Sequence, residues 1–532
     1  MQRLTNRSRR QIPLYPSSFI LYPFLVSRAF RIVAPLLLLT MCVVYAVRTI
    51  GGGEDFWAHA ALGRWALENG AVPRRTLFLW SADIPWIFHS WLSGVLFALI
   101  LGNVGVWGAV ALNIVMATAP FAITYNWWRN HKTVSSVGVI LFSVAIFLAA
   151  ARFRLRTEMF TMFFLSIVAT FILHDHKKRW HYVGIAAIFA LWPNLHGAVL
   201  MGLVILWSGT LAELAQFRRA AWPLLGLALV CTLCVFLFNP WHFGYAKTWS
   251  GLDTPLFHAV NEWKPFWEKP YLPAVLWGGH IAFWCAALLL WIANPKRRWV
   301  CLVWLLIVGA AFLQARRQMW LASIFALLVI LANSDLLTGP VLWRGWRAWT
   351  TGERDANPAA MLRDIGKAGA IVLVGCFIAQ GFVQYWPPKV IDETYPTKMS
   401  RYLLTKAPPG RIFNDYEYSA ALEWLLHDKR KLYVDLINAY PPQLLFEYLQ
   451  IAGGTKRGLK LLDERKFDIV ALRPRRPAEG MVNLAKFLDG NTRWRREYDG
   501  KDGTVWVRLK RYDAPLAPIP IGDIAPIPKD KS

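Results

Sequence analysis

Two adjacent carboxylates, Glu54 and Asp55, follow three glycines and open a segment that also carries His59. Acidic residues are favoured in the first turn of a helix, and residues four apart, such as Asp55 and His59, share one helix face. A carboxylate in this position can take a proton from an incoming hydroxyl group or orient it for displacement. Glu54 and Asp55 are therefore candidate residues of a functional site.

Arginines recur in two later short segments that lie between apolar stretches. Arg152, Arg154 and Arg156 lie in the first, and Arg316 and Arg317 lie in the second. Guanidinium groups hold phosphate or diphosphate by bidentate, charge-assisted hydrogen bonds. The candidate substrate-binding residues are these five arginines together with His59, His89, Asn194, His196 and Glu262.

The elements that must position these residues are strongly apolar. Of the 532 residues, 56% are hydrophobic and only 17% are charged, whereas about 25% are charged in an average soluble domain. A single soluble core could not bury so much apolar surface, and a chain so rich in aromatic residues is not disordered. The composition predicts a polytopic membrane protein.

The net charge of +26 would suggest a nucleic-acid partner in a soluble protein. Here the cations mostly form short clusters between apolar stretches, which is typical of residues that set membrane topology. We therefore expect no nucleic-acid partner. The clusters assigned to the inner side are 129–132, 177–179, 218–219, 296–298 and 344–347.

This assignment places the remaining connections on the outer side, and all the candidate site residues lie in them. Cations on that side, and polar groups at membrane depth, are costly and usually functional. We expect these residues to meet in one site. Simpler readings stay open: the segment after residue 53 could be a capped interfacial helix with an aromatic belt, Asn194 could satisfy a broken helix, and His196 could be a packed polar residue.

The apolar pattern predicts an all-α transmembrane bundle of about eleven spans over 32–384, with the N-terminus inside and the C-terminus outside. A basic cytoplasmic segment, 1–31, precedes it, and its first outer loop is 51–90. The stretch from Trp91 to Trp127 is too long for one crossing. It predicts a short helix over 91–101 and a full span from 104.

After residue 384 the charge content rises, and strand and helix patterns alternate. A small extracytoplasmic α/β domain is predicted over 385–512, with a Pro-rich, extended or disordered tail over 513–532. The expected strands are 411–414, 431–435, 467–472 and 504–508, and the expected helices are 418–427 and 442–451.

The run Glu-Asp-Phe-Trp-Ala-His at 54–59, followed by Gly63, Gly70 and Pro73, resembles the first outer loop of multispanning membrane proteins related to GT-C glycosyltransferases. Similar motifs recur at 191–197, 238–240, 262–263 and 411–416, so that the resemblance covers about 50–500. In GT-C enzymes the acid of this loop is the catalytic carboxylate, and the donor is a polyprenyl-phosphate or polyprenyl-diphosphate sugar. The resemblance implies that role for Asp55, with Glu54 as a neighbour or substitute.

Residues and resemblance together predict a hexosyl or pentosyl transferase of the bacterial inner membrane. It would move a sugar from a polyprenyl-phosphate-linked donor to a glycan, lipid or protein acceptor on the extracytoplasmic face. No metal is required if arginines neutralise the leaving phosphate, although Glu54 and Asp55 could bind Mg²⁺ or Mn²⁺. Two alternatives remain: a transporter or flippase for a lipid-linked or anionic substrate, since broken helices and midplane polar residues also mark transport sites, and a non-catalytic membrane assembly partner.

Overall fold

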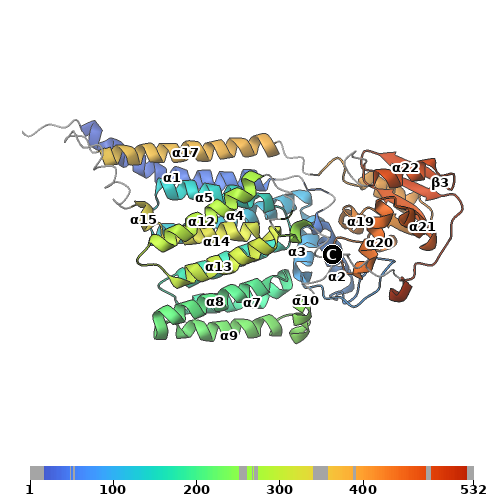
Figure 1. Ribbon diagram of the computed structural model, residues 1–532, viewed down its shortest axis with the longest axis horizontal. Helices are drawn as coiled ribbons and strands as arrows, with labels where there is room; N and C mark the ends of the chain where they lie inside the picture. The colour runs from blue at the N-terminus through green and yellow to red at the C-terminus, as the bar shows by residue number, and fades with distance from the viewer. Residues whose placement is uncertain are drawn as a thin grey trace, which may run out of the picture.

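The computed structural model describes residues 17–47, 50–51, 54–250, 261–265, 268, 274–338, 358–386, 391–474 and 481–523. A bundle of roughly parallel helices carries a smaller C-terminal domain at one end (Figure 1). The predicted segment 1–31 is described only from residue 17, the basic cluster 344–347 lies outside the described residues, and the Pro-rich tail is described to residue 523.

Long apolar stretches form helices because a helix satisfies every backbone hydrogen bond within one segment, as a lipid environment requires. The bundle consists of α1 (Ser17–Ala46), α3 (Trp91–Asn103), α4 (Val106–His131), α5 (Ser136–Ala149), α6 (Glu158–Leu173), α7 (Arg179–Leu195), α8 (Val199–Phe217), α9 (Trp222–Leu237), α12 (Ala274–Ala293), α13 (Trp299–Gln314), α14 (Met319–Ala332) and α17 (Pro358–Tyr385).

Among the described residues, five helices are long and apolar enough to cross a membrane, or six if the bent pair 222–237 and 242–249 counts as one span. The predicted figure of about eleven spans is not confirmed, because helices such as α6 and α13 are apolar but only 16 residues long. The predicted break between a short helix over 91–101 and a span from 104 is confirmed. Helix α3 ends at Asn103 and α4 begins at Val106, across a Gly105 with a φ of 76°.

The predicted first outer loop contains α2 (Asp55–Asn69), which lies at the end of the bundle next to the C-terminal domain and packs on α3. Glycines allow this close approach. A Cβ atom built on Gly63 would lie 2.0 Å from the backbone of Gly94, so a side chain at either position would push the two helices apart. Helix α2 is thereby fixed against the bundle at the end where the candidate residues lie.

The C-terminal domain contains one four-stranded sheet in the order β1-β2-β4-β3, with β1 (Arg411–Asn414), β2 (Phe467–Leu472), β3 (Trp494–Gly500) and β4 (Gly503–Arg508). Strands β1 and β2 are parallel, whereas the other two pairs are antiparallel. Its helices are α18 (Thr397–Thr405), α19 (Ser419–Leu426), α20 (Pro442–Ala452), α21 (Lys456–Glu464) and α22 (Val482–Gly490).

One predicted strand, 431–435, does not join this sheet. Its Leu432 forms an isolated bridge with Leu79 of the first outer loop instead, with Trp80 N–H donating to Leu432 O at 2.9 Å. The Trp80 ring is buried in the core of the C-terminal domain, where its Nε1 donates to Ile412 O at 3.0 Å. Arg411 lies over the same ring, 4.7 Å from its centre.

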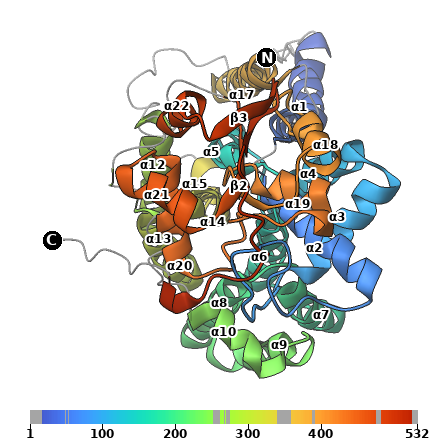
Figure 2. The ribbon, with the colours of Figure 1, turned by 90° about the vertical axis from the view of Figure 1, so that its right-hand side faces the viewer.

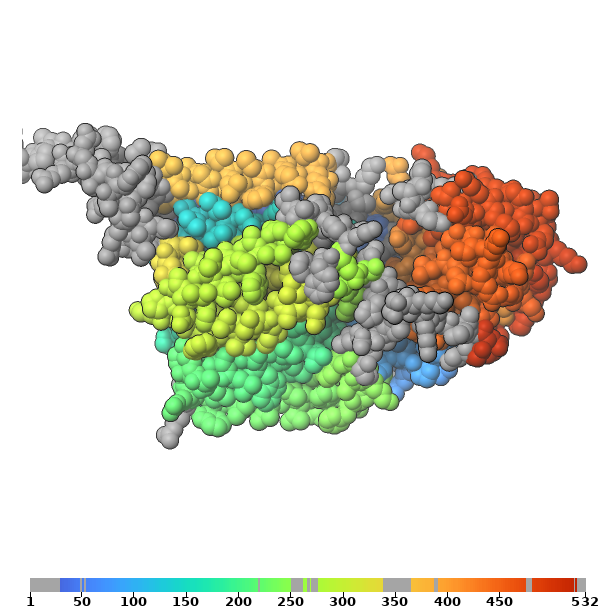
Figure 3. Space-filling model, in the orientation of Figure 1, coloured from blue at the N-terminus to red at the C-terminus, as the bar shows by residue number. Residues whose placement is uncertain are grey.

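The first outer loop therefore belongs to both parts of the molecule. Helix α19 packs on α2, and the backbone N–H of Ile519 donates to Ser81 O at 2.9 Å. Figure 2 views the molecule from the side of the C-terminal domain, and α19 lies close to α2 there. In Figure 3 the first outer loop is visible between the bundle and the C-terminal lobe. The loop connects the two parts non-covalently.

Candidate functional site

Four segments bring the charged candidate residues to the end of the bundle next to the C-terminal domain. Glu54 precedes α2, and Asp55 is its first residue. The arginines of 152–156 connect α5 to α6, beginning in the 3₁₀ turn η1 (Ala150–Arg152). Glu262 lies in the turn η4 (Asn261–Trp263), and Arg316 and Arg317 begin the turn η5 (Arg316–Gln318) that leads into α14.

The Glu54 and Asp55 carboxylates face two of the arginines. Arg154 Nη1 lies 3.3 Å from Glu54 Oε1, and Arg156 lies 3.8 Å from an oxygen of each carboxylate. The Asp55 side chain is 36% exposed and that of Glu54 is 13% exposed. Asp55 lies at the positive end of the α2 dipole and is the more exposed of the two, so it is the carboxylate better placed to meet a solvent-borne hydroxyl group.

Glu262 pairs with Arg156 and with a further arginine, Arg152. Its Oε1 is 3.1 Å from Arg156 Nη1 and 3.0 Å from Arg152 Nη1. Burial alone would raise the pKa of Glu262, but the two guanidinium charges lower it below its ordinary value. Glu262 is therefore a carboxylate at neutral pH, and Arg156 bridges it to Asp55.

Glu158, which was not among the predicted site residues, completes the network. Its carboxylate accepts from Arg152 Nη2 at 2.6 Å and from Arg317 Nη2 at 3.1 Å, and only 4% of its side chain is exposed. The Arg317 guanidinium also lies over the Trp263 ring, 4.3 Å from its centre. The available sequence signal was a carboxylate at the start of an apolar helix, two residues after an arginine.

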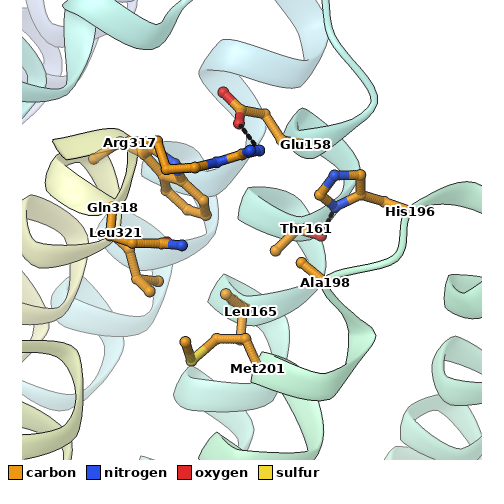
Figure 4. Close-up of a pocket in the computed structure, with 10 residues that line it drawn as sticks. Glu158, Thr161, Leu165, His196, Ala198, Met201, Arg317, Gln318 and Leu321 are labelled. Carbon is orange, nitrogen blue, oxygen red and sulfur yellow. Dashed lines mark hydrogen bonds and ion pairs between the residues drawn. The ribbon is translucent and has the colours of Figure 1, made fainter. Parts of the chain in front are cut away.

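A small cavity of about 30 Å³ lies below this network, towards the bundle interior. Figure 4 shows Glu158, Arg317, Thr161 and His196 at its polar side and Leu165, Met201 and Leu321 at its apolar side. The Thr161 hydroxyl accepts from Trp192 Nε1 at 3.0 Å and lies 2.7 Å from His196 Nδ1, to which it can donate. With Thr161 as the donor in this contact, the proton of a neutral His196 lies on Nε2.

The other two candidate histidines adjoin His196. The His89 and His196 rings are 6.5 Å apart, and His59 stacks on Phe88 with ring centres at 5.8 Å. Burial, with the charge of His89 as a smaller cause, lowers the pKa of His59 to about 3, and burial lowers that of His89 to about 4. Both rings are neutral at physiological pH, so they can act as hydrogen-bonding groups without adding to the positive charge.

Two of the predicted site residues, Asn194 and Arg316, form hydrogen bonds to other parts of the protein. Asn194 accepts from Trp91 Nε1 at 2.8 Å and donates to Phe238 O at 2.7 Å, which ties the end of α7 to neighbouring segments. Arg316 donates to the carbonyl oxygens of Pro265 and Glu268 at 3.2 and 2.6 Å. It thus holds the loop that follows Glu262.

The C-terminal domain contributes Tyr416, to which the sequence assigned no role. Burial, followed by the charges of Asp55 and Glu262 among others, raises the pKa of its hydroxyl group above the ordinary value. The hydroxyl donates to Asn438 Oδ1 at 3.0 Å. Tyr416 therefore lies within electrostatic reach of the candidate catalytic carboxylate. The sequence could not predict this placement of Tyr416, because it depends on how the C-terminal domain docks on the bundle.

Within the described residues, no group of three or more His, Cys, Asp or Glu side chains is arranged to hold a metal ion. Glu54, Asp55, Glu158 and Glu262 all lie next to arginines, so a divalent cation would compete with guanidinium groups for their oxygens. The Mg²⁺ or Mn²⁺ considered for Glu54 and Asp55 stays a prediction.

No protein-family model matches the chain. No curated protein matches it in sequence. Among solved structures, the chain is similar to the archaeal oligosaccharyltransferase AglB from Archaeoglobus fulgidus, in complex with an inhibitory peptide and a dolichol-phosphate. The TM-score is 0.56 at 12% sequence identity, over 82% of this chain and 69% of that chain. This chain therefore has a GT-C-like fold, with a bundle of apolar helices and a small C-terminal sheet.

Proposed function

We propose that the protein is an integral membrane glycosyltransferase of the GT-C type. It transfers a sugar from a polyprenyl-phosphate-linked donor to an acceptor hydroxyl or amide group at the extracytoplasmic face of a bacterial inner membrane. The observation that carries the proposal is the placement of a partly exposed carboxylate, Asp55, 3.8 Å from a guanidinium group of Arg156, at one end of an apolar bundle. The fold similarity to an oligosaccharyltransferase solved with a dolichol-phosphate supports the same class of donor.

The proposed reaction is a displacement at the anomeric carbon of the donor sugar. The acceptor atom forms a bond to that carbon, and the bond from carbon to the phosphate oxygen breaks with its electron pair on the phosphate. Asp55 accepts the proton of the acceptor as it attacks. The lipid phosphate leaves as an anion, and the arginines stabilise the charge that develops on it.

The arginines are not equivalent in this role. Arg152 and Arg317 both hold Glu158, which is almost fully buried, and Arg316 holds loop carbonyl groups. Arg154 is 51% exposed and has a looser ion pair, 3.3 Å from Glu54, while Arg156 lies between three carboxylates. We therefore assign the phosphate to Arg154 and Arg156, and assign His59, His89 and His196 to the sugar or acceptor side.

The test is Asp55→Asn in a deletion strain, with mass spectrometry of surface glycans and lipid-linked sugars. The substitution removes the proton acceptor while preserving shape, so product formation should fall by at least about 100-fold, and the lipid-linked donor should accumulate. The matched control is Asp83→Asn, because Asp83 is an exposed acid of the same outer loop that pairs with Arg75 at 2.7 Å. Full complementation by Asp55→Asn would refute the proposal.

The same strains separate the two alternatives. Loss of uptake of an anionic or lipid-linked solute with an unchanged glycan profile would indicate a transporter or flippase. Normal function in every loop variant, with loss only when residues 385–532 are deleted, would indicate an assembly partner.

A further inference from the structure

A buried pair of carboxyl groups lies where the C-terminal domain meets the first outer loop. Glu423 is on α19, the helix that packs on α2, and it is only 2% exposed. Within the residues that the structure describes, neither of its carboxyl oxygens meets a basic side chain or a backbone N–H group. Its neighbour is Asp435, which is 6% exposed.

Asp435 fixes a tight turn. Its Oδ1 accepts from the backbone N–H of Asn438 at 2.7 Å, and Asn438 has a left-handed φ of 57°. Asn438 Oδ1 lies 3.0 Å from the Tyr416 hydroxyl and 2.8 Å from the Tyr440 hydroxyl. The turn therefore sets the position of Tyr416, the residue of this domain that is influenced by the charge of Asp55.

Two adjacent carboxyl groups in a buried site do not both ionise, because each charge opposes the other and neither is hydrated. Asp435 is the natural acceptor, since backbone N–H groups already stabilise its negative charge. Burial raises the pKa of Asp435 above its ordinary value despite those N–H groups, and burial together with Asp435 raises the pKa of Glu423 well above its ordinary value. The arrangement requires one proton, held by Glu423 and donated to Asp435.

We propose that Glu423 is a positioning residue that shares a proton with Asp435 and thereby fixes the turn 435–440, which holds Tyr416 within electrostatic reach of the Asp55 carboxylate. The consequence for Asp55 chemistry rests on the proposed function, whereas the shared proton does not.

Charged groups on the elements packed against α19 contact residues other than Glu423. On α2, Arg64 lies over Trp424 and Glu68 lies 3.3 Å from His427 of the turn η6 (His427–Lys429). The remaining charged or titratable side chains on these elements are Asp55 and His59 on α2, Asp428 and Lys429 in η6, and Lys398, Arg401 and Tyr402 on α18. Among the described residues, Asp435 is the group whose charge acts on Glu423.

The sign of the pH dependence follows from proton counting. Glu423 keeps its proton in the folded protein but loses it in the unfolded chain above the ordinary glutamate pKa of 4.5, so the folded state binds more protons. Stability therefore falls as pH rises from about that value to the raised pKa of the pair. Glu423→Gln keeps a neutral donor of the same shape, and it removes this contribution.

The experiment uses the full-length protein in detergent, with thermal melting from about pH 5 to about pH 8 and infrared spectra of the C=O stretch of protonated carboxyl groups. The wild type should lose several degrees of Tm over this range, and Glu423→Gln should flatten that slope and remove one protonated-carboxyl band. Glu423→Ala should lower Tm at every pH, because it removes the donor that Gln restores. The control is Glu464→Gln, an exposed acid of the same domain that pairs with Arg457.

A protonated-carboxyl band that persists in Glu423→Gln, or an unchanged slope of Tm with pH, would overturn the proposal. If Glu423→Gln does not fold, Asp435→Asn provides a second decision, because it removes one of the two carboxyl groups and with it the charge that helps to raise the pKa of Glu423, so the slope should become shallower. An unchanged slope in that variant would also overturn it. Neither readout requires a substrate, so failure here is distinct from failure of the glycosyltransferase proposal.

Discussion

The two ends of the helical bundle both carry buried ion pairs, but their geometry differs. At the end opposite the C-terminal domain, Arg298 donates to Glu213 at 2.7 Å and to the carbonyl oxygen of Leu173 at 2.8 Å, and Glu213 is 6% exposed. At the end next to the C-terminal domain, Arg156 lies 3.8 Å from Asp55, which is 36% exposed. The first arrangement joins α6, α8 and α13 directly. The second leaves charges that an incoming ligand can exchange for its own.

This difference separates a structural ion pair from a candidate binding site. In a short ion pair such as Arg298 with Glu213, the other N–H groups of the arginine donate to backbone carbonyl groups. Few donors are then left to bind a ligand. A network in which one guanidinium bridges several carboxylates at longer distances can be reorganised at lower cost. The comparison predicts that substitutions at the end opposite the C-terminal domain will mainly lower stability. Substitutions at the end next to that domain will mainly lower activity.

The largest effect on stability is expected from Arg298→Met. Removal of this guanidinium leaves Glu213 buried without its partner, so the free energy of unfolding should fall by about 3–5 kcal/mol. Chemical denaturation in detergent measures the loss. The double variant with Glu213→Gln should recover most of it, and activity per folded molecule should be unchanged. A drop in activity of the folded fraction would contradict the structural role of this pair.

Arg156→Gln should have intermediate effects on both properties. It leaves Glu54, Asp55 and Glu262 facing one another without their shared cation, which should reduce stability by about 1–3 kcal/mol and reduce transfer activity by at least about tenfold. The measurements are the same denaturation curve and donor consumption in proteoliposomes. Wild-type activity in Arg156→Gln would remove this residue from the proposed phosphate site.

The smallest effect on stability is expected from Arg154→Gln. Its side chain is 51% exposed, so loss of the 3.3 Å pair with Glu54 should change the free energy of unfolding by less than about 1 kcal/mol. Activity should nevertheless fall through a higher KM for the lipid-linked donor. The exposed pair of Arg75 with Asp83 offers a control, since Arg75→Gln should alter neither quantity.

The sequence alone predicted much of the architecture because hydropathy and charge clusters determine which segments share an end of a membrane bundle. Residues from five separate outer connections were expected together, and Glu54, Asp55, Arg156 and Glu262, from three of them, do lie together. Their chemical roles remain predictions. The break between α3 and α4 was also predictable, since the apolar stretch exceeds one membrane thickness.

Contacts that depend on tertiary docking were not predictable. The alternation at 431–435 indicates a strand, but alternation does not specify a partner, and Leu432 pairs with Leu79. Strand β3 was missed because its residues Arg495 and Arg496 are exposed and polar, as on an edge strand. Residue type also could not distinguish an Asn194 that faces a ligand from one that binds a backbone carbonyl.

The insertion of Trp80 into the core of the C-terminal domain has a consequence for how the protein is made. The loop that carries Asp55 emerges early during synthesis, but its Trp80 and Ser81 contacts are with residues 412, 432, 433 and 519. These partners exist only after the whole bundle has been translated. Early in biogenesis the nascent chain therefore holds an unfinished first outer loop, which acquires its native shape when the distal domain folds around it.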